Sequence, residues 1–205
     1  MEKQKLALNA LSNGVTAFIG NFSIDGSYVI NGCIDLELSV NEYLMSVTNE
    51  DKVSSSLKMV MFENDKYSKI RNLSPVDKKK VQLAYALCKK EKYIFLEYFE
   101  KGLTTKEKDY FKKLFQKLKE YHITIIIHTN DINFFIGAVD KICLVKDNNV
   151  VTILSKNNWY NKEIYDYVSE PVIVEFINYC KRKGINIDNY MDNKEVIKAI
   201  FRLVS

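Results

Sequence analysis

The 205-residue sequence predicts an α/β protein in which a mainly parallel sheet is flanked by helices. Short apolar runs alternate with helical patterns through the middle of the chain. Two of these runs, residues 93–96 and 123–127, predict buried strands, because they are continuously apolar and the second is almost purely β-branched. Two capping boxes, Ser39–Glu42 and Thr104–Glu107, mark helix starts between such runs. Strands that alternate with helices in this way are typical of a parallel sheet.

The first third of the chain predicts strands joined by turns. Residues 14–20 form an apolar run between glycines, and residues 27–30 form a second run between the turn signals Asp25-Gly26 and Asn31-Gly32. A helix is expected from Ser39 to about Val47. Residues 49–56 are polar and rich in serine, which predicts a loop or a helix break. The apolar run 57–62 fits either a helix or a strand.

The middle of the chain predicts helices that pack through apolar stripes. Ser74 is expected to cap a helix that has Pro75 at its first position and ends near Lys90. In the helix after Thr104, one stripe at helical spacing predicts a buried face: Tyr110, Phe111, Leu114, Phe115, Leu118 and Tyr121. Residues 142–145 and 150–153 predict a hairpin.

The last fifty residues predict two helices, 175–183 and 193–204, with Gly184 ending the first. A short extended stretch is expected at 171–174. We therefore divide the chain into an α/β core, residues 1–155, and a mainly helical extension, residues 156–205, packed on that core.

Composition narrows the range of partners. The net charge is only +4, and lysines are interleaved with acidic residues, which indicates solvated helix faces and no nucleic-acid footprint. The densest basic run, residues 78–80, is too short to indicate phosphate binding. No apolar run approaches the roughly 20 residues that cross a bilayer, and the charged N-terminus lacks a signal-peptide core, so we expect a cytoplasmic protein.

The four cysteines and two histidines do not form metal-binding patterns. No C-x-x-C pair is present, and each cysteine has apolar sequence neighbours, which predicts small core residues in a reducing compartment. His122 and His128 flank one strand without a cluster of carboxylates or thiols. We expect no metal site and no cofactor.

From residue 14 to 151 the order of these parts resembles the ATP-binding subunit of ABC transporters. One helix begins like the family's signature, and one strand resembles Walker B with Gly-Leu after it. A second strand ends like the family's switch, and a hairpin follows that begins Asp140-Lys141-Ile142-Cys143-Leu144. The resemblance implies a P-loop-NTPase fold of reduced size. It places a vestigial nucleotide site at nine positions: Gly20, Leu73, Ser74, Glu97, Tyr98, Gly102, Leu103, Asn130 and Asp131.

The P-loop is the largest departure from the family. The P-loop pattern is G-x-x-x-x-G-K-[ST], because backbone N–H groups and a lysine surround the phosphates. Residues 14–20 resemble the strand that leads into this loop, but the pattern occurs nowhere in the sequence. Residues 25–32 resemble the strand that follows the P-loop helix, so the loop and its helix are expected to be deleted. The segment between Gly32 and Ser39, where the family has a magnesium-sensing glutamine, also looks shortened.

The remaining nucleotide-handling positions are altered. After Leu73-Ser74 the signature glycines are replaced: Pro75 removes a donor and Asp77 adds a negative charge. Glu97 stands at the family's magnesium position. Tyr98 stands at the position of the catalytic glutamate, where a phenol is a poor general base at neutral pH. The switch histidine aligns with Asn130, and His128, two residues earlier, is expected to point elsewhere.

The resemblance therefore implies a catalytically inactive ABC-ATPase-like subunit, not an enzyme, that serves as a scaffold or regulatory partner. The expected partners are an active ABC ATPase subunit, a membrane permease, or both, in a homodimer or heterodimer. Such partners would hold it at the inner face of the membrane. Two alternatives stay open. One is a stand-alone α/β interaction protein unrelated to transport, and the other is residual nucleotide binding or ATPase activity that uses Glu97, Glu100 and the lysines near Ser74.

Overall fold

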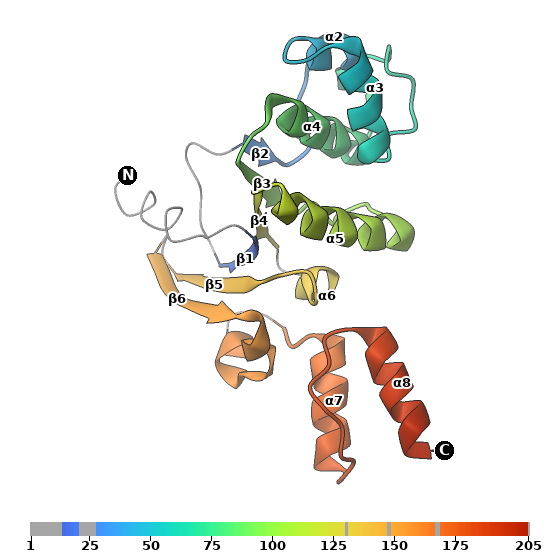
Figure 1. Cartoon of the computed structure of the whole chain (residues 1–205). Coiled ribbons are helices and arrows are strands. Elements are labelled where there is room, and N and C mark those ends of the chain that lie inside the picture. Colours follow the sequence, from blue (N-terminus) through green and yellow to red (C-terminus); the bar gives the residue numbers. More distant parts are fainter. Residues whose placement is uncertain (1–13, 21–27, 130, 147–148, 167–168, 205) are drawn as a thin grey trace.

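A computed structural model describes residues 14–20, 28–129, 131–146, 149–166 and 169–204 (Figure 1). Its centre is a six-stranded sheet in the order β2-β3-β4-β1-β5-β6. The strands are β1 (Val15–Ile19), β2 (Tyr28–Ile30), β3 (Tyr93–Glu97), β4 (Thr124–His128), β5 (Lys141–Lys146) and β6 (Asn149–Ser155). Strands β2, β3, β4, β1 and β5 are parallel, and β6 pairs antiparallel with β5. This confirms the predicted mainly parallel sheet and the terminal hairpin.

Helices flank this sheet. The α-helices are α2 (Val40–Met45), α3 (Glu50–Met59), α4 (Pro75–Lys89), α5 (Thr105–Glu120), α6 (Ile132–Phe135), α7 (Val172–Arg182) and α8 (Asn193–Val204). Short 3-10 turns are η1 (Ile70–Asn72), η2 (Lys156–Tyr160) and η3 (Lys162–Asp166). In Figure 1, α4, α5 and α6 lie along one side of the sheet, α2 and α3 lie beyond α4, and α7 and α8 lie at the opposite end. None of the helices in the described ranges is long and apolar enough to cross a membrane.

The predicted helix starts are confirmed by their caps. The Ser39 hydroxyl accepts from the Glu42 amide at 3.2 Å, and the Glu42 carboxylate accepts from the Ser39 amide at 2.7 Å. Thr104 and Glu107 form the same reciprocal pair at the start of α5. Ser74 caps α4 by accepting from the amide three residues on, with proline at the first helical position. These caps place the starts of α2, α4 and α5 where the sequence predicted them.

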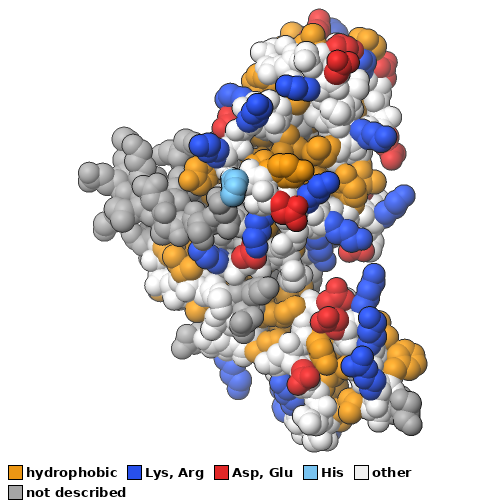
Figure 2. All heavy atoms as spheres, viewed as in Figure 1, with side chains coloured by type: hydrophobic (Ala, Val, Ile, Leu, Met, Phe, Trp, Pro, Cys, Tyr) orange, Lys and Arg blue, Asp and Glu red, His pale blue; other side chains and the backbone are white. Residues whose placement is uncertain are grey.

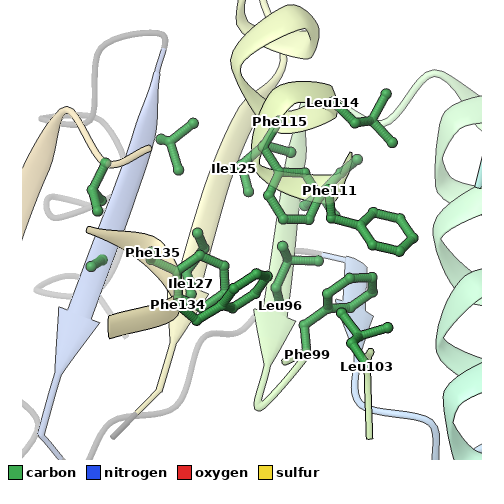
Figure 3. Close-up of a cluster of buried hydrophobic side chains, with 14 of the residues drawn as sticks. Leu96, Phe99, Leu103, Phe111, Leu114, Phe115, Ile125, Ile127, Phe134 and Phe135 are labelled. Atoms are coloured by element: carbon green, nitrogen blue, oxygen red, sulfur yellow. The ribbon is translucent and has the colours of Figure 1, made fainter. Parts of the chain in front are cut away.

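The aromatic stripe of α5 forms much of the core between that helix and the sheet. Figure 3 shows Phe111 and Phe115 of α5 facing Phe99, Leu96 and the isoleucines of β4. The Phe99 ring meets Phe111 edge-on, with centroids 4.9 Å apart. The prediction is confirmed for four members of the stripe and wrong for Tyr121, which is 66% exposed because α5 has already ended there.

Residues 50–56 lie in α3 and Asn49 is its N-cap, so the predicted loop or helix break is wrong for residues 50–56. Asn49 accepts from the Lys52 amide and caps α3, and two acidic residues in the first turn suit the helix dipole. Serines are tolerated inside α3 because their hydroxyls donate to backbone carbonyls of the same helix. The hydroxyl of Ser56, for example, donates to the Val53 carbonyl at 2.9 Å and is satisfied although buried.

Two further expectations fail. The predicted extended stretch 171–174 is extended only at Pro171, which is the N-cap of α7, and residues 172–174 are helical. Cys33 is exposed, whereas Cys143 and Cys180 are buried as predicted and Cys88 is half-buried. Residues of the extension, among them Trp159 and Ile177, belong to the same buried cluster as the sheet. The boundary at residue 155 stays a prediction.

Candidate functional site

The C-terminal ends of β1, β4 and β3 lie side by side, because these strands are adjacent and parallel. In this register His128 is level with Phe18 of β1 and with Glu97 of β3. The residues that follow these strands therefore meet at one edge of the sheet. Gly20, Glu97 and Tyr98, three of the nine predicted positions, come together there.

His128 joins the ends of these strands. One ring nitrogen, Nε2, lies 3.0 Å from the Gly20 carbonyl oxygen, and Nδ1 lies 3.9 Å from a Glu97 carboxylate oxygen. The side chain is only 8% exposed. The sequence did not single out His128, because it precedes the switch position, yet the structure brings it to three of the predicted site residues, Gly20, Glu97 and Tyr98. The sequence did contain one indication of this role, because His128 directly follows the apolar run that predicts a central strand.

Gly20 itself lies against the neighbouring strand β5. A Cβ at this position would meet the Val145 carbonyl oxygen at 2.0 Å, and the backbone has a φ of +117°. Only glycine allows this approach. The chain therefore leaves β1 in contact with β5 on one side and with the His128 ring on the other.

Tyr98 has an uncommon backbone conformation directly after β3. Its φ of 47° lies in the left-handed region, which costs a non-glycine residue roughly 1–2 kcal/mol. The surroundings hold it there: its amide donates to the His128 carbonyl at 2.9 Å, and its ring lies 5.0 Å from the His128 ring. The Lys101 amine lies 4.1 Å from the Tyr98 ring centroid, within cation–π range.

Lys79 reaches the same loop from the middle of α4. This buried side chain donates to the Tyr98 carbonyl at 2.6 Å and to the Lys101 carbonyl at 3.3 Å. Desolvation by burial lowers its pKa, against the opposing charge of Glu100. In sequence Lys79 belongs to a basic run that looks solvated, so the sequence carried no signal for this role.

A buried carboxylate completes the edge. The Thr129 hydroxyl donates to one oxygen of Glu100 at 2.8 Å and accepts from the Asp131 amide at 2.9 Å. Glu100 is 4% exposed, and its other oxygen has no hydrogen-bond partner among the residues that the structure describes. Asp131 itself points outward and accepts from the Asn133 amide. The predicted position Asn130 lies outside the described residues.

The other predicted positions lie around the start of α4. The Ser74 hydroxyl bonds both the amide and, at 2.6 Å, the carboxylate of Asp77. Leu73 packs at the edge of the core, and Leu103 is buried in it. Gly102 has a φ of +86°, and a Cβ there would lie 2.5 Å from a Val76 methyl group. The loop after β3 is therefore pressed against the first turn of α4.

Most polar groups at this edge bond to the protein itself. Lys79 donates to two carbonyl oxygens, and the Ser74 hydroxyl caps α4. One nitrogen of the His128 ring lies within hydrogen-bond distance of the Gly20 carbonyl oxygen. Glu97 keeps an accessible carboxylate, with 36% of its side chain exposed. Across the described ranges no group of three His, Cys, Asp or Glu side chains is placed to hold a metal ion.

Comparison with known proteins identifies the fold. No protein-family model matches the chain, and no curated protein matches it by sequence. Among solved structures, it is similar to cbiO1 from Clostridium perfringens, described as part of the ABC transporter complex cbiONQ. That match has a TM-score of 0.59 and 20% identity over 84% of this chain and 86% of that one.

Two further structures agree. A putative metal-chelate type ABC transporter in an inward-facing conformation matches with a TM-score of 0.60 and 13% identity, over 76% of this chain and 78% of that one. The bacterial ABC transporter cassette MJ0796, described as dimeric, matches with a TM-score of 0.59 and 15% identity, over 71% and 87%. The chain therefore has the fold of ABC transporter ATP-binding cassettes.

Proposed function

We propose that this protein is a catalytically inactive ABC-ATPase-like subunit that acts as a scaffold or regulatory partner in an ABC transporter complex. Its partner would be an active ATPase subunit, a membrane permease, or both. The fold supports the relation to ABC transporters. The residues at the C-terminal edge of the sheet support the loss of catalysis.

One observation carries the proposal: Tyr98 stands where the family places its catalytic glutamate, and it is fixed there. Its amide, carbonyl and ring each have a partner, in His128, Lys79 and Lys101. A phenol cannot act as an efficient base toward water at neutral pH. Because the backbone conformation is held on several sides, a small rearrangement would not bring a carboxylate into this place.

The length of the chain between β1 and β2 supports the same conclusion. Eight residues, 20–27, separate Ile19 from Tyr28. The P-loop pattern alone occupies eight residues, and a helix that starts at its end needs more. The lysine and hydroxyl of that pattern occur together nowhere in the sequence. Without them, tight binding of a triphosphate loses its main contacts.

Residual nucleotide chemistry is the second candidate, and one observation favours it. Glu97, at the family's magnesium position, keeps an accessible carboxylate 3.9 Å from a nitrogen of His128. A carboxylate at the end of a central strand could still meet a hydrated cation. This candidate requires ATP turnover by the purified chain that is lost in Glu97→Gln.

The proposal is tested by reconstitution. The tagged chain is co-expressed with an intact ABC ATPase subunit or a permease where a neighbouring gene encodes one, and ATP turnover of the purified complex is measured. We expect a stoichiometric complex whose turnover is abolished by a Glu→Gln change in the partner's catalytic site and unaffected by Glu97→Gln in this chain. If the chain joins no such complex and binds no nucleotide, a stand-alone interaction protein becomes the better account.

A further inference from the structure

The C-terminal ends of α7 and α8 combine basic and exposed apolar side chains. Residues 179–185 and 197–203 contain five basic residues and no acidic residue. The same segments contain five large apolar side chains that are well exposed. We name these ten residues the helix-end surface: Tyr179, Lys181, Arg182, Lys183, Ile185, Ile197, Lys198, Phe201, Arg202 and Leu203.

The two segments lie at the same end of the molecule. Helices α7 and α8 point the same way in Figure 1, and both C-terminal ends lie at the end remote from α2 and α3. Figure 2 shows blue basic and orange hydrophobic side chains over this part of the molecule, with a smaller number of red acidic side chains among them. Exposure there is high for apolar residues: 69% for Phe201, 52% for Ile197, 51% for Tyr179 and 50% for Leu203.

Helical spacing explains how α8 presents these groups. Val196 is buried and Ile200 is partly buried, so these residues anchor the helix to the body. Ile197 and Phe201 form an outward row, because they are four residues apart. Lys198 and Arg202 form a second exposed row one residue further along. An apolar row therefore runs beside a basic row, as in amphipathic helices that lie on membrane surfaces.

Helix stability explains only part of this pattern. Basic residues near the C-terminal ends of helices favour the helix dipole, and this accounts for Lys181, Arg182 and Arg202. It does not account for large apolar side chains left in solvent beside them. Contiguous exposed apolar surface is uncommon on soluble proteins and marks contact with a protein, a ligand or a lipid surface.

We propose that the helix-end surface binds an anionic lipid membrane directly, independently of any ABC partner. Its charge favours lipid over protein, because lysine is depleted in the centres of protein interfaces, whereas anionic headgroups attract Lys and Arg. The apolar row enters the region below the headgroups, and the basic row remains at their level. At the end of α7 a basic and an aromatic side chain lie together, because the Lys183 amine is 5.7 Å from the centroid of the exposed Tyr179 ring.

The test is flotation of the full chain with phosphatidylcholine vesicles that contain about 30% phosphatidylserine. We expect the chain to float with these vesicles, to stay behind with pure phosphatidylcholine, and to dissociate at high salt. Lys198→Gln with Arg202→Gln should weaken binding about 25-fold, since each basic residue near such a surface contributes about fivefold. Ile197→Gln with Leu203→Gln should abolish flotation.

A matched control removes two charges elsewhere. Lys113 and Lys117 are exposed on α5, and replacing both with glutamine should leave flotation unchanged. Equal binding to both vesicle types, or equal losses in the control, would overturn the proposal. Failure to float with the anionic vesicles would also overturn it. Self-association that Ile197→Gln and Leu203→Gln abolish would then assign the surface to a second copy of the chain. Circular dichroism of each variant shows that it is folded.

Discussion

Replacing Lys80 with methionine should lower the free energy of unfolding by about 3 kcal/mol. The Lys80 side chain is 7% exposed, and its amine donates to a Glu107 carboxylate oxygen at 2.5 Å and to the Met61 carbonyl at 3.0 Å. It thereby ties α4 to the start of α5 and to the end of α3. Breaking a buried ion pair by removing one partner costs about 3–5 kcal/mol. We expect the lower end, because Glu107 is 15% exposed and keeps its bonds to Thr104.

The same pair makes stability depend on pH. Burial alone would raise the pKa of Glu107, but hydrogen bonds from Lys80 and Thr104 outweigh it and lower this pKa from 4.5 to about 2. A carboxyl group whose pKa is lower in the folded protein than in the unfolded chain stabilises the fold at pH values above its unfolded-state pKa. This stabilisation is lost as the pH falls toward its folded-state pKa. The difference between wild type and Lys80→Met should therefore shrink from about 3 kcal/mol at pH 7 to about half that at pH 3.

Urea unfolding followed by circular dichroism at both pH values measures this difference. The control is Lys69→Met, which removes an ion pair with Glu37 whose two side chains are more than half exposed, and which should leave stability nearly unchanged. If Lys80→Met and Lys69→Met unfold at the same urea concentration at pH 7, the assignment of Lys80 as a buried structural cation is wrong.

Two other changes test the loop after β3. Gly102→Ala should cost about 2–3 kcal/mol, because its Cβ would lie 2.5 Å from a Val76 methyl group at a φ of +86°. The control is Gly184→Ala, because Gly184 has a similar φ of +79° but an added Cβ there would meet nothing within 4 Å, so this change should cost only about 1 kcal/mol. If both variants lose the same free energy of unfolding in urea, the close contact between Gly102 and Val76 is contradicted. Tyr98→Glu restores a carboxylate at the catalytic position but no P-loop lysine, so phosphate release from ATP should stay at background; turnover above it would mean that the nucleotide site survives.

Local rules in the sequence predicted much of the fold. Ser39, Ser74 and Thr104 start helices because each side chain accepts from a nearby amide, and this chemistry is complete within four residues. The strand at 123–127 was predictable because only a strand covered on both faces is so uniformly apolar. The errors at 49–56 and 171–174 arose where polar or proline residues serve as helix caps, which composition alone does not distinguish from loops.

The site was less predictable, because its contacts join residues far apart in the chain. The bond of His128 to the Gly20 carbonyl spans 108 positions, and Lys79 reaches carbonyls about twenty positions away. Neither contact has a local sequence pattern. Tyr98 follows β3, as its position after an apolar run predicted, but its left-handed φ and its three partners follow from packing between α4, β3 and β4.

We propose that this ABC-type fold no longer binds ATP, and calorimetric titration of the purified full chain with Mg-ATP tests this proposal. An intact ABC ATPase subunit measured under the same conditions provides the positive control. We expect no heat of binding from this chain up to millimolar ATP. Micromolar binding would contradict it, because the segment between β1 and β2 would then have to supply the phosphate contacts that its sequence lacks.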